Sequence, residues 1–193
     1  MAARGEPLRQ QVLDAAERLL RQGNAEFSMR ELAADAGVSF ATPFNQFGSK
    51  AAIMLALSAR RIDTMAERFG GFTTNEDAAI GVLRATEIAS AVMLEEPQVN
   101  RTVMGWIGMP GLSSAKVLDH SSALWALALG TGDGLAQARR EQALRDLPRQ
   151  LAFAFRGVLS FWTAGELSDE ALAAEARDVA RALLQGFLDD KET

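Results

Sequence analysis

The apolar residues of this chain recur with the 3.6-residue period of α-helices along almost its whole length. The first stripe has arginine and glutamate on its opposite side and consists of Leu8, Val12, Ala16, Leu19 and Leu20. Later patterns predict helices over 28–37, 38–47, 49–68, 76–95, 98–107, 114–129, 134–145, 148–165 and 169–188. No segment shows the sustained alternation that is typical of strands. The sequence therefore predicts an all-α fold.

The boundaries of the second helix carry the strongest local signals. Ser28 and Glu31 have the spacing of a capping box, and Phe27 precedes Leu32 as a hydrophobic staple would. The helix is expected to stop at Gly37, because glycine enters the left-handed region at little cost. A second short helix follows from about Ser39, so residues 28–47 have the layout of a helix-turn-helix.

This unit has an apolar underside and a polar outer face. The underside is formed by Leu32, Ala36, Val38 and Phe47. The side chains of the helix over 38–47 that are left to face outward are Phe40, Thr42, Asn45 and Gln46. A helix-turn-helix inserts its second helix into the major groove, which is about 12 Å wide, where asparagine and glutamine pair with adenine edges. On the pattern alone, an ordinary helical hairpin in a helical core is the alternative.

The order and spacing of these motifs over residues 8–57 resemble the DNA-binding domain of the tetracycline-repressor (TetR) family. The segments that carry the resemblance are Val12–Ala16, Ser28–Ala33, Ala36–Ser39 and Phe44–Lys50. The resemblance implies an all-helical homodimer with a DNA-binding head and a divergent ligand-binding body. It also implies DNA contacts for the residues at positions that commonly touch DNA in the family: Thr42, Phe44, Gln46 and Lys50.

Three residues depart from the family pattern. Phe44 stands in place of the usual tyrosine and lacks the hydroxyl that could bond a phosphate, and Gln46 stands in place of the usual histidine. Pro43 replaces an aliphatic residue, and proline inside a helix costs about 3 kcal/mol or more. This cost disappears if Thr42 is the N-cap and Pro43 the first helical residue. We therefore expect a short or shifted recognition helix.

The sequence divides into three expected parts: a helix-turn-helix head over 1–50, a connecting helix over 51–70 that ends at Gly70-Gly71, and a ligand-binding and dimerisation body over 71–193. The full set of expected DNA-binding residues in the head is Ser28, Arg30, Ser39, Phe40, Thr42, Phe44, Asn45, Gln46 and Lys50.

Composition and charge refine this interpretation. The 193 residues are 48% hydrophobic and 23% charged, as in ordinary globular proteins. The net charge of −5 opposes nucleic-acid binding at first sight, but residues 1–68 carry nine Lys/Arg against eight Asp/Glu, and no acid occurs between Ala36 and Ile62. An acid-free segment in an acidic chain is compatible with a local DNA-binding face. The chain shows no apolar run of signal-peptide or membrane-span length, so a cytoplasmic location is expected.

The body offers a candidate pocket and a candidate dimer interface. Methionine and aromatic side chains suit a mostly apolar pocket, although the same residues at helical spacing are more often core. The candidate pocket residues are Met93, Met104, Trp106, Met109, His120, Leu124 and Trp125. The last two helices resemble those that pair across a two-fold axis in TetR-like regulators. Their expected interface residues are Phe153, Gly157, Phe161, Ala180 and Leu184, and core helices of a monomer are the alternative.

The sequence nominates no catalytic residue, metal ligand or cofactor. A chain with one histidine and no cysteine lacks the usual zinc sites, and Gly130–Gly134 fails the phosphate-loop pattern. Three hypotheses follow. The first is a non-enzymatic repressor that a small apolar effector releases from a pseudo-palindromic double-stranded DNA operator. The second is a DNA-binding dimer without small-molecule input, and the third is an apolar-ligand-binding protein that has lost DNA binding.

Overall fold

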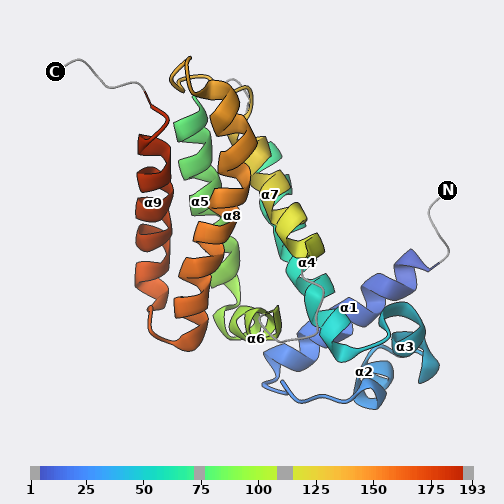
Figure 1. Cartoon of the computed structure of the whole chain (residues 1–193). Coiled ribbons are helices and arrows are strands. Elements are labelled where there is room, and N and C mark those ends of the chain that lie inside the picture. Colours follow the sequence, from blue (N-terminus) through green and yellow to red (C-terminus); the bar gives the residue numbers. More distant parts are fainter. Residues whose placement is uncertain (1–4, 72–76, 108–114, 189–193) are drawn as a thin grey trace. The chain divides into compact units, whose positions relative to one another are not determined.

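The computed structural model describes residues 5–71, 77–107 and 115–188, and these residues form helices and connecting turns without strands (Figure 1). None of the helices in these ranges is long and apolar enough to cross a membrane. The predicted all-α fold is confirmed. The helices in these ranges are α1 (Glu6–Arg21), α2 (Met29–Asp35), α3 (Ala41–Phe47), α4 (Lys50–Gly70), α5 (Ala78–Glu95), α6 (Pro97–Ile107), α7 (Ala115–Leu129), α8 (Arg140–Ala164) and α9 (Asp169–Gln185).

The helices belong to two compact units that do not follow the order of the chain. The head unit contains residues 1–58 and 96–113, and the second unit, here called the bundle, contains residues 59–95 and 114–193. The three consecutive parts expected from the sequence differ from this division in two respects. Helix α4 contributes to both units, and α6 packs with the head although it follows α5 in the chain.

The head is built around one hydrophobic core. Helix α1 buries its apolar stripe there, including Val12, Ala16 and Leu19, and the staple residues Phe27 and Leu32 are buried in the same cluster. Helix α4 adds Ile53, Met54 and Leu57, and α6 adds Val99 and Val103. Short helices such as α2 and α3 are marginal in isolation, so this shared core is what stabilises them.

The bundle consists mainly of four helices, each of which packs against two others. Helix α5 contacts α7 and α9, and α8 also contacts α7 and α9 (Figure 1). The C-terminal part of α4 joins them through an ion pair between Arg68 and Glu95 of α5. It also contacts α7, where His120 Nε2 lies 2.8 Å from Asp63 Oδ1. The Arg68 guanidinium lowers the pKa of Glu95 below its usual value.

Helix α8 corrects one sequence prediction. The sequence suggested two helices, 134–145 and 148–165, with a break before Pro148. The structure has one helix from Arg140 to Ala164, and Pro148 is buried inside it. Proline deprives the carbonyl of Leu144 of its partner, at a cost of about 3 kcal/mol. Burial of Ala143, Leu147 and Leu151 on one face of the continuous helix offsets this cost.

Gly81 allows α5 and α7 to approach closely. A Cβ atom at position 81 would lie 2.3 Å from the backbone oxygen of Ala128. Real Cβ atoms do not come so close to a backbone carbonyl, so a larger residue would force the two helices apart.

We predict opposite effects for two glycine-to-alanine substitutions in helices. Gly81→Ala should lower the free energy of unfolding by about 1–3 kcal/mol, because the added methyl group meets the α7 backbone. Gly105→Ala in α6 should raise it by about 0.5–1 kcal/mol, since a Cβ there meets nothing within 4 Å and alanine favours the helix. Urea unfolding followed by circular dichroism measures both changes. A neutral or stabilising effect of Gly81→Ala would contradict the close packing of α5 on α7.

Candidate nucleic-acid interface

Helix α2 begins with the capping box that the sequence predicts. The backbone N–H of Glu31 donates to Ser28 Oγ at 3.2 Å, and the backbone N–H of Ser28 donates to Glu31 Oε2 at 2.7 Å. The bond from the Ser28 backbone is the main reason why the pKa of the Glu31 carboxyl lies below its usual value. The Ser28 side chain is thereby committed to the helix start.

The turn between α2 and α3 is closed by backbone bonds around Gly37. The N–H of Val38 donates to the carbonyl of Ala33 at 3.0 Å, and the N–H of Gly37 donates to Ala34 at 3.1 Å. This pair of bonds is a Schellman motif, and Gly37 has the positive φ of 64° that the motif requires. The predicted stop at Gly37 is confirmed, and it turns the chain sharply into α3.

Helix α3 is short, as expected, but it does not begin where the sequence suggested. Its first residue is Ala41 and its N-cap is Phe40, so Thr42 is not the N-cap that would remove the cost of Pro43. The Thr42 hydroxyl is bonded to Ser39 Oγ at 2.8 Å instead. Pro43 is the third helical residue, and the first-turn N–H that it lacks would have had no partner within the helix.

The outer face of α3 combines two aromatic rings with polar side chains. Phe40 is 55% exposed and Phe44 is 42% exposed. Their rings pack edge to face with centroids 5.6 Å apart, and the Arg30 guanidinium lies 5.6 Å from the Phe40 centroid. Asn45, the next residue of α3, is also exposed. The structure thus brings together Arg30, Phe40 and Phe44 on one surface.

Two of the expected DNA-binding residues have partners inside the head. Gln46 is half-buried, and its backbone oxygen accepts from Arg9 Nη1 at 3.1 Å. Lys50 Nζ donates to the carbonyl of Ala25 at 2.6 Å and lies 4.5 Å from the Phe27 ring. An ammonium has three donors, so the Ala25 bond leaves Lys50 able to bond a phosphate as well.

The two acids of α2 are held by other groups. Asp35 pairs with Arg18, whose Nη2 lies 2.8 Å from Asp35 Oδ2, and Glu31 is engaged in the capping box. No acid occurs between Ala36 and Ile62. A polyanion that approached α3 would therefore meet no acid of α3 or of the first two turns of α4.

The expected pocket residues divide between the two units. Met104 and Trp106 belong to the head, whereas Met93, Leu124 and Trp125 are buried in the bundle. His120 is paired with Asp63, and Met109 lies outside the described residues.

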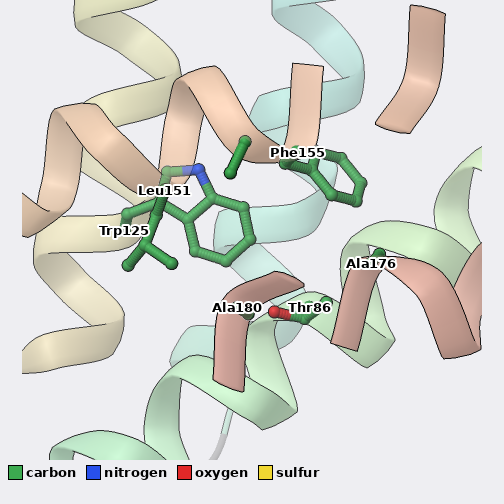
Figure 2. A pocket seen from close by; sticks show the side chains of 7 residues that line it. Thr86, Trp125, Leu151, Phe155, Ala176 and Ala180 are labelled. Carbon is green, nitrogen blue, oxygen red and sulfur yellow. The ribbon is translucent and has the colours of Figure 1, made fainter. Parts of the chain in front are cut away.

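The bundle holds a small cavity, and Trp125 is the candidate pocket residue that lines it. The cavity has room for the centre of one water molecule, about 10 Å³, and Figure 2 shows the side chains around it. Trp125 is 1% exposed, and its indole N–H has no hydrogen-bond acceptor in the described part of the chain. The lining residues are Thr86, Trp125, Leu151, Ala154, Phe155, Ala176 and Ala180. The four-residue spacing of Leu151 with Phe155 and of Ala176 with Ala180 indicates shared helix faces, but the sequence cannot show that α5, α7, α8 and α9 meet there.

The expected interface residues divide between the surface and the core. Phe153 and Phe161 are exposed, and a Cβ on Gly157 would meet no atom within 4 Å. Ala180 and Leu184 are only 4% and 1% exposed. The prediction that these two residues lie on a surface between protomers is wrong, because their face of α9 fills the core of its own bundle.

Residues 12–57 match the model of a family described as bacterial regulatory proteins, tetR family. Among solved structures, a TetR transcriptional regulator from Rhodococcus sp. RHA1 is 23% identical, over 93% of this chain and 98% of its own, with a TM-score of 0.74. Thermus thermophilus FadR, a TetR-family transcriptional repressor solved in complex with lauroyl-CoA, is 22% identical over 95% of this chain and 97% of its own, also with a TM-score of 0.74. No curated protein sequence matches the chain. The resemblance of the head is thus confirmed, and the whole chain has the fold of these structures.

Proposed function

We propose that this chain is a homodimeric repressor of the tetR family of bacterial regulatory proteins, and that a small apolar molecule releases it from its operator. The observation that carries the proposal is the outer face of α3, where exposed side chains stand on a helix-turn-helix and no acid lies nearby along the chain. Such a face suits the major groove, while basic side chains of the head supply contacts to phosphates.

The outer face of α8 supports the dimer. Phe153, Gly157 and Phe161 recur every four residues and so form one stripe along the helix. Gly157 has one exposed phenylalanine on each side along the stripe. Because glycine has no side chain, a second helix can approach this surface closely. Val179 is also exposed, on α9, which packs against α8. A dimer would bury these side chains and present two heads to one pseudo-palindrome.

The bundle cavity supports an apolar effector with at least one hydrogen-bond acceptor. Most of its lining is apolar, and the Trp125 N–H is a buried donor without an acceptor among the described residues. FadR from Thermus thermophilus, which has a similar fold, was solved with lauroyl-CoA. The cavity as it stands admits only a water, so an acyl or aromatic ligand must favour a conformation in which the bundle has opened. A ligand that prefers such a conformation shifts the population toward it.

The size of this cavity also favours a second candidate function. A cavity with room for one water is also what the ordinary core of a regulator contains when the regulator responds to no small molecule. DNA binding is common to both candidates, and only release by a ligand separates them.

We predict that the full-length protein selects a pseudo-palindrome from random double-stranded DNA at low salt, with half-sites about one helical turn or more apart. Lys50→Gln should weaken binding to all sequences. If each protomer of a dimer loses one phosphate contact, the slope of log K against log salt should fall by about 1.8. The control is Arg181→Gln on α9, which should leave the slope unchanged. Failure to select any sequence would contradict the DNA-binding function. An unchanged slope would show that Lys50 contacts no phosphate and serves only to bond the carbonyl of Ala25.

We predict that Gly157→Arg yields monomers, because it places a bulky charge at the centre of the exposed stripe on α8. Analytical ultracentrifugation at micromolar concentration measures the change, and operator affinity should fall with it, since one head meets one half-site. Ala126→Arg, on an exposed position of α7, is the matched control and should remain dimeric. A wild-type protein that sediments as a monomer would disprove the dimer.

We predict that an apolar ligand lowers operator affinity by about 5- to 150-fold, the usual range of allosteric coupling. Fluorescence anisotropy with labelled operator, in the presence of fatty acids, acyl-CoAs and aromatic acids of increasing length, measures the release. Ala154→Leu narrows the cavity and should abolish release while affinity without ligand is retained. Ala126→Leu is the exposed control. If no compound shifts operator affinity, the proposal of release by an effector is wrong. The second candidate, a regulator without small-molecule input, then stands.

A further inference from the structure

Phe40 and Phe44 form an exposed aromatic pair on the helix that faces DNA in the proposed function. Single exposed apolar residues are ordinary, but two rings in mutual contact make an apolar spot that must be explained. Their edge-to-face packing at 5.6 Å and an interplanar angle of 66° fixes each ring against the other. The spot is therefore preorganised, and neither ring carries a group that could bond a phosphate or a base edge.

The surroundings of the pair indicate an anionic partner with apolar groups. Arg30 stands over the Phe40 ring, and the nearest acids of α2 are held by Arg18 and by the capping box. Double-stranded DNA has this character, since the only apolar group that its bases present in the major groove is the C5-methyl of thymine. A phenylalanine ring can recognise that methyl group and nothing else on the base edges.

We propose that Phe40 and Phe44 are specificity-determining residues that read the C5-methyl groups of thymines within each half-site. This inference rests on the proposed DNA-binding function. It adds that the half-sites must contain thymines at the positions that face Phe40 and Phe44. Asn45, exposed on the same helix, reads a base edge by hydrogen bonds and so contributes a different kind of discrimination.

Replacement of thymine by deoxyuridine tests the inference, because it removes the methyl group and keeps every donor and acceptor. The selected operator is synthesised with deoxyuridine at one thymine position at a time, in both half-sites, and its affinity for the full-length protein is measured. One or two positions should each weaken binding about fourfold per half-site, and so about 16-fold for the symmetric pair. Fourfold corresponds to about 0.8 kcal/mol, the value of one buried methylene-sized group.

Variants of α3 assign the effect to the rings. Phe40→Ala and Phe44→Ala should bind the thymine operator more weakly and should each lose the sensitivity to deoxyuridine at one position. Phe44→Tyr keeps the ring and should keep the sensitivity. Asn45→Ala is the matched control on the same helix: it should alter sequence preference while the deoxyuridine effect persists.

The outcomes separate this inference from the function on which it rests. If the wild-type protein selects a specific operator but tolerates deoxyuridine at every thymine, the reading of methyl groups is wrong and the DNA-binding function stands. If the effect persists in both alanine variants, another residue reads the methyl groups and the assignment to these rings is wrong. If the protein selects no sequence, the proposed function and this inference fail together. The scan of the wild-type protein decides the main point even if a variant fails to fold.

Discussion

The hydrophobic core of the head is the feature on which the surface of α3 depends. Helices α2 and α3 are seven residues each, too short to be stable alone. They hold their positions because α1 packs against both of them and shares one apolar core with α4 and α6. Val99 and Val103 of α6 belong to this core although residues 59–95, which are part of the bundle, intervene in the chain. The head is thus completed by α6, a helix that lies outside its N-terminal segment, residues 1–58.

The same core explains why the residues expected to bind DNA have different roles. Phe40 and Phe44 point away from the core and are exposed, whereas Gln46 and Lys50 lie where α3 and α4 meet the rest of the head. Lys50 bonds the carbonyl of Ala25, just before α2, and its ammonium lies 5.4 Å from the Trp106 ring of α6. One side chain therefore contacts both the helix-turn-helix and the helix that completes its core, which gives Lys50 a structural role besides any contact with DNA.

The bundle divides its helix faces between its own interior and an outer surface. Leu151, Phe155 and Ala180 surround the small cavity, while Phe153 and Phe161 stand on the outside of the same α8. Because a helix turns 100° per residue, neighbours in the sequence belong to different environments. The proposed effector site and the proposed dimer interface are consequently two faces of α8, so an expansion of the cavity would move the surface on which a second protomer docks.

The sequence by itself determined the features that depend on local chemistry. The period of apolar residues determines the helices, Ser28 and Glu31 the capping box, and Gly37 the turn, because each signal acts within a few residues. The tertiary structure decided what depends on contacts between distant segments. It placed α6 in the head and turned Ala180 toward the core. Packing against α7 and α9 also kept α8 continuous through Pro148, since burial along a whole helix outweighs the loss of one backbone bond.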